Sequence, residues 1–204
     1  MRLPYRGPLD FRAALDELAD RRIPGVEAVD GDCYRRTIVG HNFPGMIEVK
    51  DPGDGGHLEF VAHVPTWRLI IEDVAACRRL FDLDAELCER HEPCEQPADC
   101  SEAQTHSCAR ELGAWDGFET AVVQLLSAEP GHRVGSCLAG ALARGLGTAL
   151  PRLGVPRLTH VFPSAQRVAS AGLDEVVGCG LPLEAAEAVV ALASAASGAS
   201  PRAI

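Results

Sequence analysis

The chain has 204 residues, a length that fits one large domain or two small ones. Its sequence contains no apolar run long enough to span a bilayer, and its first residues carry acids and lack the apolar centre of a secretory signal. The formal net charge is -10. These features predict an acidic, soluble protein of the cytoplasm and exclude a membrane-spanning one.

The negative charge is concentrated in one part of the chain. Residues 82–119 have a balance of -9, whereas residues 1–81 have -2 and residues 120–204 have +1. A protein that binds duplex DNA usually has a basic surface, because much of its affinity comes from neutralising phosphates. The charge distribution therefore predicts weak DNA binding or none.

The first 85 residues predict a small α+β domain. Asp10 is a candidate cap for a helix that begins at Phe11, with Leu15 and Leu18 on the same face. Three short alternating segments follow at 33–39, 44–50 and 57–63, separated by Gly, Pro, Asn and Asp. Helical spacing of apolar residues then predicts a second helix over 67–81. We expect an antiparallel sheet with flanking helices.

The last part of the chain predicts mostly helices. Asp116 and Glu119 form a capping pattern before the apolar stripe of 118–126, and a second helix is expected over 136–146. Ser164 is a candidate cap for a short helix that ends at Ala171, and residues 183–196 predict a long alanine-rich helix. We therefore divide the chain into an α+β domain at 1–85, an acidic, Cys-rich connector at 86–112 and a helical domain at 113–204.

Five segments resemble AlkA-type DNA-3-methyladenine glycosylases, in the order in which that family has them. They are PYRGPLDFRAALDELADRRIPGVEAVDGDCYRRTI near the start, RRLFDLDA at 78–85, GAWDGFETAV at 113–122, THVFPSAQRVASAGLDEV at 159–176 and GLPLEAAEAVVALASAA at 180–196. The resemblance implies an N-terminal antiparallel sheet with flanking helices. It further implies that the opening helices of a helix-hairpin-helix glycosylase domain follow.

Two departures from the family pattern bear on function. The resemblance places Glu129 where the family has an apolar wedge that fills the gap left by a flipped base, and a carboxylate is poorly suited to that role. In the family, the segment that matches 191–198 leads into a Gly-rich hairpin and the catalytic aspartate, and residues 1–204 contain no counterpart of either. We therefore expect a degenerate member that lacks base excision on its own.

The connector contains a candidate metal site. Its cysteines, with His91 and His106 between them, have the spacing C-x5-C-x5-C-x7-C and are Cys88, Cys94, Cys100 and Cys108. Thiolates and imidazoles suit zinc or an iron–sulfur cluster, and an ion could order a segment too polar to fold by hydrophobic burial. The alternatives are disulfides, which a cytoplasmic location disfavours, and a solvated connector with free thiols.

Other polar and aromatic residues have simpler interpretations. Glu129 and His132 flank a Pro-Gly turn and are candidates for a catalytic acid–base pair, although an ordinary surface loop is the favoured explanation. Trp67 and Trp115 are expected to be core anchors, and Asp116 a helix cap. The remaining cysteines lie in apolar contexts and are expected to be buried: Cys33, Cys77, Cys137 and Cys179.

Three functions remain open from the sequence. The first is a binding or accessory module that has lost base excision. The second is a glycosylase fold repurposed as an enzyme on a small molecule, with its cleft near Glu129 and His132. The third is a DNA-repair glycosylase completed by a partner chain. A homodimer or a protein partner is expected in each case, to cover an apolar helical face.

Overall fold

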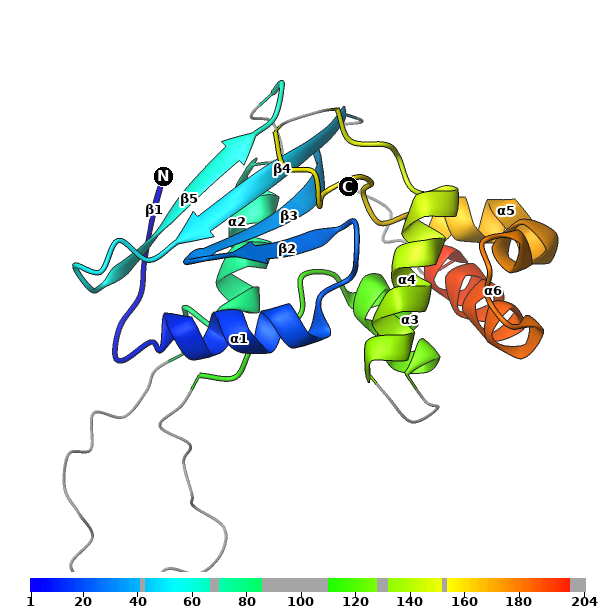
Figure 1. Cartoon of the computed structure of the whole chain (residues 1–204), viewed down its shortest axis with the longest axis horizontal. Helices are drawn as coiled ribbons and strands as arrows, with labels where there is room; N and C mark the ends of the chain where they lie inside the picture. Colours follow the sequence, from blue (N-terminus) through cyan, green and yellow to red (C-terminus); the bar gives the residue numbers. More distant parts are fainter. Residues whose placement is uncertain (41–42, 67–69, 86–109, 128–131, 152–153, 199–204) are drawn as a thin grey trace, which may run out of the picture.

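The computed structural model describes residues 1–40, 43–66, 70–85, 110–127, 132–151 and 154–198. These residues form a five-stranded antiparallel sheet and six helices, which confirms the α+β class. Figure 1 shows the sheet with α1 and α2 beside a bundle of four helices, α3 to α6. None of the helices in these ranges is both long and apolar enough to cross a membrane.

The sheet has the strand order β1-β5-β4-β3-β2. Its strands are β1 (Arg2–Pro4), β2 (Glu27–Asp30), β3 (Cys33–Gly40), β4 (Phe43–Lys50) and β5 (His57–His63). The three central strands lie where the alternating segments predicted them. The short edge strand β1 was not predicted, because its 3 residues are too few to show a periodic pattern.

Both N-terminal helices cover the same face of the sheet. The helix α1 (Phe11–Arg21) begins as predicted, with the Asp10 carboxylate accepting a hydrogen bond of 2.9 Å from the Ala13 N–H. The helix α2 (Ile70–Leu80) confirms the second predicted helix, whose first residues, 67–69, lie outside the described ranges. Between the helices and the sheet lies a core that includes Phe11, Leu15, Tyr34, Ile47, Phe60, Leu80 and Phe81.

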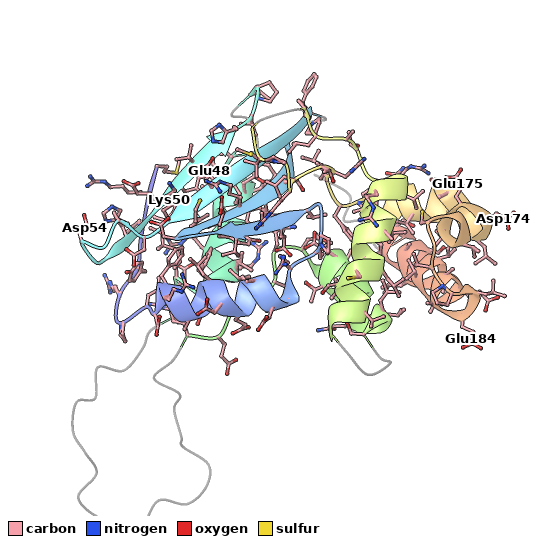
Figure 2. The ribbon with its side chains drawn as sticks, viewed as in Figure 1. Glu48, Lys50, Asp54, Asp174, Glu175 and Glu184 are labelled. Atoms are coloured by element: carbon pink, nitrogen blue, oxygen red, sulfur yellow. The ribbon has the colours of Figure 1, made fainter. Side chains whose placement is uncertain are left out.

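The opposite face of the sheet is polar in part and covered in part. Glu48 and Lys50 of β4 lie on this polar face (Figure 2). Residues 147–151 and 154–161, between α4 and α5, pass over the neighbouring area (Figure 1), where Leu158 packs against Met46. The Thr37 hydroxyl donates a hydrogen bond of 2.9 Å to the His160 carbonyl. The connection thus joins the sheet to the helical bundle.

The bundle consists of α3 (Gly117–Leu126), α4 (His132–Leu146), α5 (Ala165–Gly178) and α6 (Leu183–Gly198). The helix α4 starts earlier than predicted. The Ser164 cap of α5 is confirmed, since its hydroxyl accepts from the Arg167 N–H, but α5 does not end at Ala171. Gly172 has φ +75°, a conformation that suits glycine, and helix resumes beyond this kink. The sequence interpretation mistook the kink for the end of the helix.

The chain between α1 and β2 links the two halves of the molecule. Ile23 and Val26 are buried in the core of the bundle, together with Val122 of α3 and Leu142 of α4. A Cβ atom on Gly140 would lie 2.7 Å from the Pro24 carbonyl oxygen, so only glycine lets α4 approach this segment so closely. The bundle is therefore packed directly on the N-terminal domain.

The prediction that four cysteines are buried is half correct. Cys33 and Cys77 are buried, whereas Cys137 is exposed and Cys179 is half-buried. The neighbour of Cys137, Ser136, faces inward and donates to the Arg21 carbonyl oxygen. The next residue of the helix is rotated by about 100° and therefore faces solvent. Apolar neighbours in the sequence do not reveal this helical phase.

The two ends of the Cys-rich connector meet at one place. After α2, the Gly113 N–H donates a hydrogen bond of 3.0 Å to the Leu80 carbonyl oxygen. The Arg110 guanidinium donates to the carbonyl oxygens of Pro8 and Asp82 and lies 5.4 Å from the centre of the Tyr5 ring. Hydrogen bonds therefore hold the two ends of the connector together, independently of the residues between 85 and 110.

Because the two ends of the connector are held together, we predict that residues 86–109 can be replaced by a short Gly–Ser linker without loss of the fold. We expect a cooperative thermal transition with a midpoint within about 3 °C of the parent chain, because shortening a loop changes its closure entropy only slightly. Circular dichroism measures the transition. In the full chain, Arg110→Ala should lower the midpoint. A broad, non-cooperative transition of the linker variant would show that the segment is needed for folding.

Candidate functional site: the junction between sheet and helices

Arg36 of β3 lies at the junction of the two halves, with only 2% of its surface exposed. Its Nη2 group donates to both carboxylate oxygens of Glu119 on α3, at 2.9 and 2.7 Å. Its Nη1 group donates to a carboxylate oxygen of Glu27 on β2, at 3.3 Å. A single side chain of the sheet therefore binds both its neighbouring strand and the first helix of the bundle.

The second carboxylate of this cluster is held from two further directions. The Tyr34 hydroxyl donates a hydrogen bond of 2.5 Å to Oε1 of Glu27. The Ile23 N–H donates one of 2.9 Å to its Oε2. Hydrogen bonds to both carboxylate oxygens thus fix the orientation of Glu27 independently of Arg36. We call Glu27, Tyr34, Arg36 and Glu119 the junction cluster.

The junction cluster places one guanidinium against two carboxylates in the interior. Burial raises the pKa of Glu119, and the attraction of its ionised form to Arg36 opposes that rise. Burial, and then the negative charge of Glu27, raise the pKa of Tyr34 well above its ordinary value, so this hydroxyl stays protonated. Tyr34 therefore acts as a hydrogen-bond donor and not as an acid at neutral pH.

Trp115 covers the guanidinium, whose central carbon lies 4.7 Å from the centre of the indole ring. This half-buried position supports the expectation that Trp115 is structural. The Nε atom of Arg36 is buried and has no hydrogen-bond acceptor within the described ranges. The cluster thus fixes the junction but leaves one N–H group of its central cation unsatisfied.

Two hollows flank the junction cluster. The smaller, of about 190 Å³, is bordered by α1, by residues 113–115 and by the side of α3 that carries Thr120, Val123 and Gln124. The larger, of about 520 Å³, we call the α2–α5 groove. It lies between β3 (residues 36–39), α2, residues 115–119, the turn at 161–165 that leads into α5, and Ala196 of α6.

The α2–α5 groove has an acidic wall and an apolar one. Glu72, Asp73 and Arg79 of α2 line one side, while Phe118 and Phe162 lie with ring centres 6.4 Å apart. Burial, reinforced by the charge of Glu72, raises the pKa of Asp73 to about 6. A carboxyl group in a cavity with a pKa this close to neutrality is a candidate functional group.

The residues predicted to form the site fall mostly outside the described ranges. These are Glu129 and the four connector cysteines, Cys88, Cys94, Cys100 and Cys108. His132 is the first residue of α4, but its side chain is not among those described. Within the described ranges, no group of three His, Cys, Asp or Glu side chains is arranged to hold a metal ion. The metal and acid–base hypotheses remain predictions.

The sequence predicted the helix cap beside the junction cluster but not the ion pairs within the cluster. Asp116 is a helix cap, as predicted, and accepts from the Glu119 N–H at 2.9 Å. The Glu119 side chain does not complete a reciprocal capping pair, because it binds Arg36 instead. One signal for Arg36 was available: the period of 2 along β3 places it between Tyr34 and Ile38 on the apolar face. A charged residue at such a position requires a buried partner.

The geometry predicts that Arg36→Met strongly destabilises the chain. Removing the cation leaves two buried carboxylates unpaired, and we expect a loss of about 3–5 kcal/mol of unfolding free energy. The matched control is Arg35→Met on the same strand. Arg35 faces the polar side of the sheet and pairs with the exposed Asp30 and with Glu48, which is partly exposed, so its loss should cost less, about 1–2 kcal/mol. Urea unfolding followed by tryptophan fluorescence measures both, and equal losses would contradict the role of Arg36.

A second prediction concerns the pH dependence caused by Asp73. Its pKa is raised from 3.8 to about 6 in the fold, so the folded chain binds more protons than the unfolded chain between these values. Its contribution to stability is therefore present at low pH and lost as pH rises through about 6. We expect Asp73→Asn to raise the melting temperature by about 2–4 °C at neutral pH. At pH values near the unfolded pKa the difference should vanish.

A control of opposite sign is available for this experiment. Arg78 forms hydrogen bonds to Asp84 and lowers its pKa, so Asp84→Asn should slightly reduce stability at neutral pH. Thermal melts over a pH series compare the two variants. A gain from Asp73→Asn that is independent of pH would show that the titration of this carboxyl is not the cause.

Comparison with known proteins places this arrangement in a family. A family model described as the AlkA N-terminal domain matches residues 1–116, which is more than half of the chain. Two curated relatives, from two strains of Mycobacterium tuberculosis, are each described as a probable bifunctional transcriptional activator/DNA repair enzyme AlkA. Both are 29% identical over 171 residues, which cover 83% of this chain and 34% of the relative.

Solved structures support the fold. A 3-methyladenine DNA-glycosylase from Archaeoglobus fulgidus has a TM-score of 0.70 and 16% identity, covering 95% of this chain and 66% of that one. A structure of MBOgg1 in complex with a low-affinity DNA ligand has a TM-score of 0.56, also at 16% identity, covering 92% and 60%. The chain thus spans about a third of the length of the curated relatives, and 66% and 60% of the two solved structures. By its sequence and its fold, the chain belongs to the AlkA-type DNA-3-methyladenine glycosylase family.

Proposed function

We propose that residues 1–204 act as an AlkA-type module that binds or assists and does not itself excise bases. The observation that carries this proposal is the use of the acidic side chains at the junction. Base excision in this family requires a carboxylate that is free to act on the nucleotide. At the junction, Glu27 and Glu119 are engaged by Arg36, and Asp116 caps α3.

The smaller hollow gives further support. The charged side chains around it are Glu27, Glu119, Arg36 and Arg21, and the Arg21 guanidinium donates to the Gly113 carbonyl oxygen at 2.8 Å. Each of these groups has a partner that maintains the fold. A hollow whose ionic groups bind one another suits structural support better than proton transfer or charge stabilisation.

The charge of the chain supports weak contact with DNA at most. The formal net charge of the chain is -10, and two of its carboxylates, those of Glu72 and Asp73, line the α2–α5 groove. Phosphates would be repelled there. Because the chain spans 34% of the curated relatives, the DNA-repair activity in their description is not transferred to it as a whole.

Base release from duplex DNA tests the proposal directly. Purified protein is incubated with a duplex that contains 3-methyladenine, and free base is measured by chromatography against a no-enzyme control. We expect no release above the spontaneous rate. In parallel, binding to a duplex with an abasic-site analogue should be weaker than about 1 µM at physiological salt. Release that depends on the protein, or nanomolar binding, would contradict the proposal.

A second function is favoured by one observation, the carboxyl of Asp73 with its pKa of about 6 in a groove of about 520 Å³. A group with this pKa can donate and accept protons near neutral pH. The alternative is therefore an enzyme on a small molecule whose acid–base residue is Asp73, in place of the pair Glu129 and His132. An activity that survives Asp73→Asn would remove this candidate.

A further inference from the structure

The α2–α5 groove contains a carboxylate that has no partner among the residues that the structure describes. Asp73 is half-buried in the groove wall, and no side chain or backbone group of the described ranges forms a hydrogen bond or an ion pair with it. The adjacent Glu72 also lacks an ion pair there and adds a second negative charge. Partial burial and the charge of Glu72 disfavour the ionised form of Asp73, so a positive group that enters the groove would stabilise it.

The positive groups nearest to this wall are already engaged. Arg36 attracts Asp73 through space, but its guanidinium is held by Glu119 and Glu27. Arg79 lies on the same helix, and its guanidinium donates to the Trp115 carbonyl oxygen at 3.3 Å. Neither arginine makes a direct bond to Asp73. The groove therefore keeps a local excess of negative charge at α2.

The facing wall offers an apolar surface. Phe118 and Phe162 are half-buried neighbours, with their rings tilted by 59° and their centres 6.4 Å apart. Val39 of β3 also borders the groove and has 49% of its surface exposed. The hollow of about 520 Å³ therefore combines an apolar surface with a wall of charged groups, and it is large enough for a small molecule.

We propose that the α2–α5 groove binds a small organic cation. An ammonium or amidinium group pairs with Asp73 and Glu72, and the apolar or aromatic body of the ligand packs against Phe118 and Phe162. Arg36 also borders the groove, and its buried Nε–H group lacks an acceptor within the described ranges, which favours ligands that carry a hydrogen-bond acceptor as well. At neutral pH most Asp73 carboxyls are ionised, since the pKa is about 6, which suits a cationic ligand.

The site is held in place by bonds across the junction. Residues 115–119 are fixed by the Glu119–Arg36 pair, and the turn at 161–165 is fixed by the bond from the Thr37 hydroxyl to the His160 carbonyl oxygen. The apolar wall is therefore positioned before any ligand arrives, which lowers the entropic cost of binding. The inference concerns what the groove binds, and it holds whether the bound molecule is converted or only recognised.

The test uses 2-phenylethylammonium as the cation, with 2-phenylethanol and phenylacetate as the neutral and anionic probes of similar shape. Each is titrated into ¹⁵N-labelled protein and followed by amide chemical shifts. We expect saturable binding of the cation with a Kd of about 1 mM, the affinity typical of so small a ligand, and at least tenfold weaker binding of the other two. The shifted amides should include those of Thr37, Asp73 and Ser164.

A pair of matched variants identifies the charged wall. The double variant Glu72→Gln, Asp73→Asn should weaken binding of the cation at least tenfold, and it should fold at least as stably as the parent, because it removes an unpaired carboxylate. The control is Asp174→Asn, Glu175→Gln. This double variant makes the same change of charge on α5, where both residues lie at the outer end of the bundle (Figure 2). It should leave the Kd within about twofold, since exposed charges beyond a Debye length are screened.

Three results would overturn the proposal. One is the absence of saturable binding of the cation up to about 20 mM, well above the expected Kd. Another is equal binding of the cation and the alcohol, which would show a purely apolar site. The last is equal weakening by both double variants, which would show a response to net charge alone. Base release, measured as above, is independent of all three results.

Discussion

The ion pair between Arg36 and Glu119 is the interaction on which the rest of the structure depends. It joins β3 to α3, and with Glu27 and Tyr34 it brings polar groups of three elements into an interior that water does not reach. Removing one partner would leave a buried charge unpaired, which costs far more than the loss of an exposed ion pair. The two halves of the molecule therefore hold one relative position.

That fixed position creates the hollows on either side of the junction cluster. The smaller one is bordered by groups that already bind one another, so its chemistry is used for the fold. The α2–α5 groove differs, because the carboxylate of Asp73 has no partner among the described residues and two aromatic rings line the same groove. The junction cluster thus lies between two hollows. The charged groups of the smaller one stabilise the fold, and the α2–α5 groove is the one in which we propose that a ligand binds.

Membership of the AlkA-type family explains the fold without deciding the chemistry. A scaffold can keep its strands, caps and core while the residues that act on a substrate change, because packing and catalysis depend on different side chains. In this chain, the acidic residues at the junction support the fold. The groups most suited to new chemistry are those without a structural role, and Asp73 is the clearest of them within the described ranges.

The sequence by itself determined the elements whose signals are local. Asp10, Asp116 and Ser164 cap helices where they were expected, and alternation predicted the central strands, because caps and strand period depend on neighbours along the chain. Only the tertiary structure decided which residues meet across the chain. Arg36 and Glu119 are far apart in sequence, the exposure of Cys137 depends on helical phase, and the raised pKa of Asp73 requires the walls that surround it. These properties arise from packing between elements, which no single segment specifies.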